Sequence, residues 1–166
     1  MKRRDFVKLF FGALSPFVVQ LKPKEAYSRF SQPFISLCNL AISHEYGAIV
    51  QYINHSGLIA DSNIKKILEK NMQDEIVHAR KLTEILVKEG ASPTVSIWPP
   101  QTGKGLKKLI EEDIEGENAA IKLYSQILDL PESKKYRDVI YSFLKREEIH
   151  RSRLVEIMSA VRKSKT

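Results

Sequence analysis

The feature that most constrains this chain is an internal repeat with an offset of 72 residues. The identical pairs at that offset include these nine: Glu45/Glu117, Ala48/Ala120, Ile49/Ile121, Tyr52/Tyr124, Glu75/Glu147, His78/His150, Leu82/Leu154, Glu84/Glu156 and Ile85/Ile157. Any one residue type occurs by chance at roughly one position in 10 to 20. Nine identities at a single offset therefore indicate two copies of one structural unit.

The spacing of apolar residues indicates which unit is repeated. From about residue 33 they recur at every third or fourth position, which is the period of a buried helix face. This pattern predicts four helices, at about residues 33–57, 62–89, 104–129 and 134–162. Gly57 and Gly90 mark helix ends, and Asp61 or Ser62 can cap the second helix. Residues 90–103 are rich in Pro and Gly, so we expect them to form a long non-helical connection between the second and third helices. Four helices with one long crossover predict an all-α, antiparallel four-helix bundle.

Each apolar stripe is interrupted near its middle by Glu or by Glu-x-x-His. Glu45 and Glu75 are equidistant from the first turn, and Glu117 and Glu147 are equidistant from the second. Equidistant residues of an antiparallel hairpin lie opposite each other, and residues three apart share one helix face. We therefore expect four carboxylates and two imidazoles at one level of the bundle interior, namely Glu45, Glu75, His78, Glu117, Glu147 and His150.

Such a cluster needs a source of positive charge. Burying one carboxylate costs several kcal/mol unless the charge is neutralised, and the four stripes carry no Lys or Arg at this level. Two divalent cations would balance four carboxylates. Oxygen ligands with two imidazoles suit iron or manganese, whereas the chain's single cysteine, Cys38, excludes a thiolate zinc site and an intramolecular disulfide.

These residues resemble the ligand set of the ferritin-like di-iron carboxylate proteins, in which two helices give one Glu each and two give Glu-x-x-His. The resemblance covers nearly all of residues 33–162. Two segments resemble the first and second helices of bacterioferritins, Glu45-x-x-Ala48-Ile49-x-Gln51-Tyr52-x-x-His55 and Asp74-Glu75-x-x-His78-Ala79. The dipeptide Gly116-Glu117 resembles rubrerythrins, but their additional glutamate is replaced by Ala120.

The resemblance implies specific roles for the six residues. Glu75 and Glu147 would bridge two iron ions, and Glu45 and Glu117 would be terminal ligands. His78 and His150 would bind one ion each, and a manganese or mixed pair would use the same ligands. Asp74 could orient one histidine, although its repeat counterpart is Arg146.

Departures from the family narrow the expected function. Ile76 stands where bacterioferritins have a haem-ligating Met, so no haem is expected. No fifth helix like that of 24-subunit cages follows residue 162, which disfavours a cage and leaves a homodimer open. No rubredoxin-like cysteine set is present, so an electron donor would be external. The expected function is oxidation of Fe(II), or reduction of O2 or hydrogen peroxide, at a non-haem di-iron site.

Residues 1–28 are typical of an export segment. A basic start is followed by the short apolar stretch Leu9–Val19 and by the small residues Ala26 and Ser28, and Arg3-Arg4-x-Phe6-Val7-Lys8 resembles the twin-arginine motif. We therefore expect a signal peptide at 1–28, a bundle at 29–166 and a periplasmic location, or membrane anchoring by an uncleaved leader. The alternative is a basic amphipathic helix lying on the bundle or on a membrane.

The net charge of +7 does not by itself indicate a nucleic-acid partner. Residues 1–28 contain six Lys or Arg and two acidic residues and so contribute +4, which leaves +3 for the remainder. That small excess over a helical body is weak evidence for binding a polyanion. We expect no nucleic acid.

Several other residues have two interpretations. Tyr52 faces the carboxylates and is the candidate catalytic residue, whereas for Tyr124 we expect a core tyrosine hydrogen-bonded to a ligand glutamate. His44 and His55 are expected at the surface, with transient iron binding at His55 as the alternative. The acidic run at 111–115 is expected to be solvated, with iron access as the alternative. Trp98 is expected to cover the side of the bundle, and Cys38 to be a small buried residue.

Two rival functions also fit the sequence. One is an exported metal-binding or metal-sequestering protein without catalytic turnover, which would need the same ligands. The other is a metal-free bundle that acts as an interaction module. The ligand set alone does not choose among these and the di-iron oxidoreductase, because a fold and its ligands do not specify a reaction.

Overall fold

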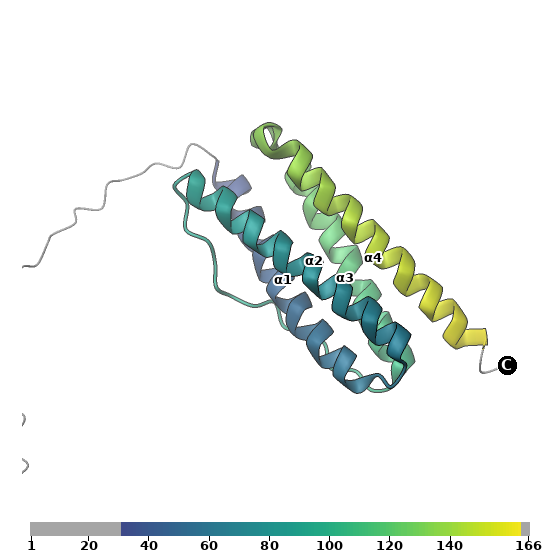
Figure 1. Ribbon diagram of the computed structural model, residues 1–166. Coiled ribbons are helices and arrows are strands. Elements are labelled where there is room, and N and C mark those ends of the chain that lie inside the picture. Colours follow the sequence, from purple (N-terminus) through teal and green to yellow (C-terminus); the bar gives the residue numbers. More distant parts are fainter. Residues whose placement is uncertain (1–30, 164–166) are drawn as a thin grey trace, which may run out of the picture.

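The computed structural model describes residues 31–163 (Figure 1). Four long helices form the bundle, namely α1 (Gln32–Leu58), α2 (Ser62–Lys88), α3 (Leu106–Leu128) and α4 (Arg137–Lys163). The predicted number and order of helices are confirmed, and their ends agree within three residues. The predicted export segment at 1–28 and both ends of the predicted domain lie outside the described residues. Within residues 31–163, no helix has the length and apolar character needed to span a lipid bilayer.

The connections fix the direction of each helix. α1 and α2 form one antiparallel hairpin and α3 and α4 form the other, while α2 and α3 run in the same direction because the crossover traverses the bundle (Figure 1). Asp61 caps α2, since its Oδ1 accepts hydrogen bonds from the backbone N–H groups of Asn63 and Ile64 at 2.8 and 3.0 Å. Gly90, with φ 76°, ends the second helical segment in a left-handed conformation.

The second turn differs from the prediction. Residues Pro131–Tyr136 form a short 3-10 helix, η1, so α4 begins at Arg137 and not at 134. The Ser133 hydroxyl donates to the backbone carbonyls of Leu128 and Leu130 at 3.1 and 2.8 Å. These bonds satisfy carbonyl groups that the end of α3 leaves without helical partners.

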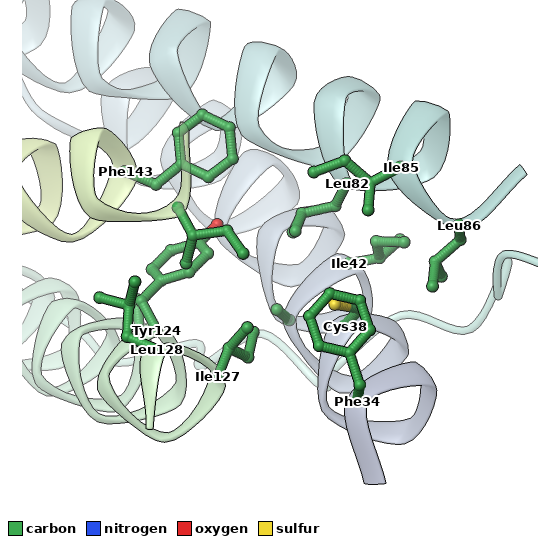
Figure 2. Close-up of a cluster of buried hydrophobic side chains, with 13 residues drawn as sticks. Phe34, Cys38, Ile42, Leu82, Ile85, Leu86, Tyr124, Ile127, Leu128 and Phe143 are labelled. Atoms are coloured by element: carbon green, nitrogen blue, oxygen red, sulfur yellow. The ribbon is translucent and has the colours of Figure 1, made fainter. Parts of the chain in front are cut away.

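Two apolar clusters enclose the middle of the bundle. The first is built around Phe34, Ile42, Leu82, Tyr124 and Phe143, and its side chains converge from all four helices (Figure 2). The second includes Tyr52, Leu68, Ile110, Leu154 and Met158. Cys38 lies in the first cluster, as expected, and burial raises the pKa of its thiol to about 12. A polar layer separates the two clusters.

The crossover is attached to α1. The Trp98 backbone N–H donates to the Ser43 carbonyl at 2.8 Å, and the Thr94 N–H donates to Oδ1 of Asn39 at 2.7 Å. A Cβ atom at Gly47 would lie 2.5 Å from the Trp98 carbonyl oxygen, so only glycine permits this approach. The crossover therefore covers one side of α1, and Trp98 lies on the bundle as predicted.

Candidate metal centre

Six polar side chains meet in the middle of the bundle, at the level between the two apolar clusters. Every helix contributes, and each of the six residues is at most 4% exposed: Glu45, Glu75, His78, Glu117, Glu147 and His150. They form two overlapping groups whose candidate ligand atoms lie within 4.8 Å of one another. Glu45 and His78 belong to the first group, Glu117 and His150 belong to the second, and Glu75 and Glu147 belong to both.

The two shared carboxylates lie between the two imidazoles. His78 Nδ1 is 2.9 Å from Oε2 of Glu75 and 2.7 Å from Oε1 of Glu147. His150 Nδ1 is 3.0 Å from Oε1 of Glu75 and 3.2 Å from Oε2 of Glu147. Each shared glutamate thus presents one oxygen to each histidine. This is the arrangement in which a carboxylate can connect two cations.

Two tyrosines hold the remaining glutamates across the bundle. The Tyr124 hydroxyl donates to Oε1 of Glu45 at 2.6 Å, which confirms the expected hydrogen bond from a core tyrosine to a glutamate of the cluster. The Tyr52 hydroxyl donates to Oε1 of Glu117 and accepts a bond from Nδ2 of Asn71 at 3.4 Å. Each tyrosine therefore reaches a glutamate of the other hairpin, so the two repeats are interlocked at this level.

The histidines differ in what lies behind them. His150 Nε2 is 3.1 Å from Oδ2 of Asp74, which is also 3.7 Å from Nε of Arg146. The His78 ring instead packs against Phe143, with ring centroids 4.5 Å apart, and makes an edge contact with Tyr124 at 6.1 Å. A carboxylate on the outer nitrogen fixes the ring orientation and increases the basicity of the inner nitrogen.

The protonation of the cluster follows from its burial. Burial, reinforced by the charges of Glu147 and Glu75, raises the pKa of Glu45 and of Glu117 well above the usual range. Burial alone would raise the pKa of Glu147, but the close approach of the His150 and His78 imidazoles outweighs it and lowers this pKa to about 2. The close approach of the Glu147 and Glu75 carboxylates to His78 works against burial and raises the pKa of His78 to about 9. In the absence of metal, protons on these groups offset the carboxylate charge.

The donor set fits a pair of metal ions. Both oxygens of Glu75, Oε1 of Glu147 and Nδ1 of His78 are buried atoms without a hydrogen bond of good geometry. Within residues 31–163, no Lys or Arg forms an ion pair with the four glutamates. Oxygen-rich coordination with one imidazole per ion is typical of iron and manganese. The groups therefore fit a dinuclear site, in which two divalent cations replace the protons.

The prediction that His44, His55 and the acidic run at 111–115 are solvated was wrong for both histidines and for part of the run. His44 is 7% exposed and His55 is fully buried, and Glu112 and Asp113 are also buried. His55 Nδ1 is 2.8 Å from Oδ1 of Asp113, and this contact outweighs burial and raises the pKa of His55. The prediction was wrong because the crossover, which helical periodicity does not locate, covers this side of α1 and α3.

A sequence signal for this polar network did exist. Asp113 precedes Glu117 by four residues, and Gln51 precedes His55 by four, so each pair shares a helix face. Gln51 Nε2 donates to Oδ1 of Asp113 at 3.0 Å, and its Oε1 accepts from the backbone N–H of Gln101 at 2.8 Å. The network thus joins α1, α3 and the crossover beside the glutamate cluster.

A cavity of about 230 Å³ adjoins the cluster between α1, α3 and the crossover. Its walls include four of the six central residues, Glu45, Glu75, Glu117 and Glu147. Trp98 and Glu115, which are exposed, also line it. The cavity therefore extends from the molecular surface to the glutamates.

Comparisons with known proteins agree with this architecture. Among curated proteins, bacterioferritin of Rhodobacter capsulatus is 33% identical over 99 residues, which cover 57% of this chain and 62% of that protein. Bacterioferritin of Brucella melitensis biotype 1 is 30% identical over 96 residues, which cover 55% and 60%. The matched segment thus spans less than two thirds of either relative.

Solved structures show the same fold at low sequence identity. Rhodobacter capsulatus bacterioferritin, described with a metal-free dinuclear site and a haem iron, has a TM-score of 0.73 at 24% identity and covers 81% of this chain and 88% of its own. A ferritin-like di-iron carboxylate protein of Bacillus anthracis has the same TM-score at 20% identity, with coverages of 78% and 99%.

A third structure, the dodecameric thioferritin of Bacteroides fragilis, is described as bacterioferritin-related. It has a TM-score of 0.73 at 20% identity and covers 80% of this chain and 88% of its own. The ferritin-like domain itself matches residues 35–164, which is most of the chain. The bundle, its crossover and this match together place the chain in the ferritin-like domain family.

Proposed function

We propose that this protein binds two iron ions between its hairpins and uses them to oxidise Fe(II) or to reduce O2 or hydrogen peroxide. The observation that carries the proposal is the sharing of Glu75 and Glu147 between two ligand groups. A bound iron pair would supply the electrons for a two-electron reduction of the oxidant. A manganese or mixed pair would use the same side chains.

Each residue has a defined part in this proposal. Glu75 and Glu147 would hold both ions, because each presents one oxygen to each histidine. Glu45 and Glu117 are terminal ligands, held by hydrogen bonds from Tyr124 and Tyr52. His78 and His150 each bind one ion. Their inner nitrogens already face the shared carboxylates, so binding requires loss of protons rather than a large rearrangement.

Tyr52 is the proposed catalytic residue. Its hydroxyl contacts Glu117, and Tyr52 itself lines the cavity that leads to the cluster. Burial, followed by the charges of Glu117 and Asp113, raises the pKa of Tyr52 well above its usual value. The phenol therefore keeps its proton at neutral pH and is available as a hydrogen-bond donor or a source of an electron with its proton.

Three further features complete the proposal. Ile76 offers no ligand atom where a haem thioether would be needed, so haem is not included. An external protein or small molecule supplies electrons after each oxidation. The chain is exported to the periplasm or anchored by its leader, and it assembles into a homodimer rather than a cage.

The proposal is tested by anaerobic titration with Fe(II), followed by O2 and hydrogen peroxide in separate runs. We expect about two irons per chain and an oxidant-dependent rise in near-ultraviolet absorbance. Glu147→Gln should lose both the bound iron and the rise in absorbance. Its matched control is Glu148→Gln, one residue away and 43% exposed, which should behave as the wild type.

Two outcomes contradict the proposal. Two tightly bound irons that neither oxidant turns over would favour the rival function, a metal-binding or sequestering protein. Absence of metal binding in the wild type would favour a structural bundle. The comparison of O2 with peroxide identifies the preferred oxidant.

A further inference from the structure

The positive charge of the bundle is concentrated on one side. α1 carries no Lys or Arg, and its single acidic residue, Glu45, is buried. Most of the Lys and Arg residues within 31–163 lie on α2 and α4. These two helices form the front of the bundle in Figure 1. A partner that recognises charge would therefore meet opposite conditions on the α1 side and on the side of α2 and α4.

A stripe of side chains follows the line along which α2 and α4 meet. Asp74 of α2 lies 3.7 Å from Arg146 and 3.1 Å from His150 of α4, and these contacts locate that line. Residues three or four apart share a helix face, so the same spacing on either side of the contacts places further side chains along it. We call this surface the basic seam, and it consists of Lys70, Val77 and Lys81 of α2 with Arg146, Ile149 and Arg153 of α4.

Two bases of the basic seam lack an acidic partner. Lys81 pairs with the exposed Glu84 at 2.8 Å, and Arg146 lies beside Asp74. Lys70 and Arg153 form no ion pair within residues 31–163, and Nη1 of Arg153 is a buried atom without a hydrogen-bond acceptor. Buried polar atoms in folded proteins almost always have a partner. The surface thus offers positive charge and a donor that a carboxylate of another molecule could satisfy.

The middle of the basic seam is apolar. Val77 and Ile149 are 39% and 42% exposed. They are equivalent positions of the 72-residue repeat, as are Lys81 and Arg153, so both copies place an aliphatic and a basic residue on the outside. An apolar centre with a polar rim is typical of a protein interface. These residues line neither of the two described cavities, so the surface suits a protein better than a small molecule.

The basic seam lies directly over one end of the glutamate cluster. The Asp74 side chain is 27% exposed, and its Oδ2 contacts Nε2 of His150. Nδ1 of the same ring is 3.0 Å from Oε1 of Glu75. One buried imidazole therefore separates this surface from the shared carboxylates. The cavity between α1 and α3 also reaches the cluster, but its lining is acidic and would repel an acidic protein.

We propose that the basic seam is the docking surface for an acidic electron-transfer protein, which reduces the metal pair from the side of His150. The inference rests on the proposed function, because a bound metal pair must receive the electrons. A carrier of one electron is oxidised once at each visit, so two reduced carriers return two Fe(III) ions to Fe(II). The bases attract and orient the partner, and the apolar centre is buried against it.

Binding to the metal-free full chain tests the docking surface independently of the metal. The probe is an oxidised acidic ferredoxin of the plant type, and isothermal titration measures its dissociation constant. Lys70→Glu combined with Lys81→Glu should weaken binding about tenfold, because it reverses two exposed charges of the seam. Lys104→Glu combined with Lys122→Glu is the matched control. Both control residues are exposed, form no ion pair within residues 31–163 and lie outside α2 and α4.

Two further measurements separate docking from general attraction between opposite charges. Added salt should weaken binding by the wild type more than binding by the charge-reversed variant, because salt screens exposed charges. Ile149→Ser should weaken binding without changing its dependence on salt, because it alters only the apolar centre. Full affinity in Ile149→Ser would overturn the role of that centre.

Reduction of the iron-loaded full chain tests electron delivery. After oxidation by O2, the chain is mixed anaerobically with reduced ferredoxin below saturation, and stopped flow follows the loss of near-ultraviolet absorbance. The variant with Lys70→Glu and Lys81→Glu should be reduced about tenfold more slowly than the wild type. Reduced methyl viologen, which is small and positively charged, should reduce this variant at least as fast as the wild type.

Four outcomes would contradict the expectations. Absence of ferredoxin binding to the wild type, or an equal change in the seam and control variants, would overturn the docking surface. A duplex oligonucleotide that binds as tightly as ferredoxin and loses affinity in the same variant would identify a polyanion surface instead. Reduction by methyl viologen but not by ferredoxin would overturn electron delivery. If the chain binds no iron, the proposed function itself is wrong, whatever the ferredoxin titration gives.

Discussion

The two hairpins contribute the same candidate ligand residues but surround their histidines differently. His150 of the second hairpin contacts the Asp74 carboxylate, which comes from the first hairpin. His78 of the first hairpin packs against Phe143, which comes from the second. The repeat positions equivalent to Asp74 and Phe143 are Arg146 and Asn71. The repeat therefore retains the candidate ligand residues and varies the residues that contact the outer side of each imidazole ring.

This difference makes the two halves of the site chemically unequal. A carboxylate behind an imidazole orients the ring and strengthens its donation to a metal. An aromatic ring behind an imidazole excludes water but offers no proton acceptor of comparable strength. We therefore expect the ion bound to His150 to be held more tightly than the ion bound to His78.

The largest expected effect separates shared from unshared glutamates in both hairpins. Glu75→Gln should lose both metals, whereas Glu45→Gln should lose only one, because Glu75 belongs to both ligand groups and Glu45 to one. In the second hairpin, Glu147→Gln should likewise lose both metals and Glu117→Gln only one. Metal content after dialysis measures the stoichiometry, and thermal melts without metal verify folding. Equal losses from Glu75→Gln and Glu45→Gln would refute the assignment of bridging and terminal roles.

The second prediction concerns pH in the absence of metal. The pKa of His78 rises from 6.5 in the unfolded chain to about 9 when folded, so its charge stabilises the fold below pH 6.5. That stability should disappear as the pH rises from 6.5 to 9, and it amounts to ~3 kcal/mol at most. Thermal melts across this range measure it. His78→Gln should reduce this dependence, to which His150, whose pKa is also raised by the neighbouring carboxylates, contributes as well. An unchanged slope in that variant would exclude a contribution from His78.

The third prediction concerns Asp74, the residue behind His150. Asp74→Asn should weaken the binding of one metal about 10- to 100-fold and leave the other unaffected. Arg146→Gln is the matched control, since it removes only the partner of Asp74 at 3.7 Å and leaves the contact with His150. Isothermal titration with Co²⁺ resolves the two affinities. If Asp74→Asn weakens the binding of both ions equally, the two halves of the site do not differ in metal affinity because of Asp74.

The smallest expected effect separates the two tyrosines. Tyr52→Phe and Tyr124→Phe each remove a hydrogen bond to a buried glutamate and should cost about 1 kcal/mol, or roughly 2–4 °C in melting temperature. Only Tyr52→Phe should also slow oxidation, because Tyr52 lines the cavity and Tyr124 does not. Stopped-flow absorbance after addition of O2 measures the rate. Equal slowing by both substitutions would argue against a catalytic role for Tyr52.

Much of the fold could be predicted from the sequence because it depends on local spacing. The three- and four-residue period set the helices, and the 72-residue repeat placed Glu45, Glu75, Glu117 and Glu147 at one level of the bundle. The start of α4 was displaced to Arg137 because Pro131 begins a 3-10 turn. Helix ends depend on capping contacts that a period does not encode.

Other features were decided only by the tertiary structure. The sequence left open which histidine Asp74 would contact, and it placed His44 and Asp113 in solvent. Both answers depend on contacts between segments far apart in the chain, since Asp74 meets His150 across the bundle and the crossover covers His44 and Asp113. The candidate ligand residues thus follow from local periodicity, whereas burial, cavity shape and the partner of each imidazole follow from how the helices and the crossover pack.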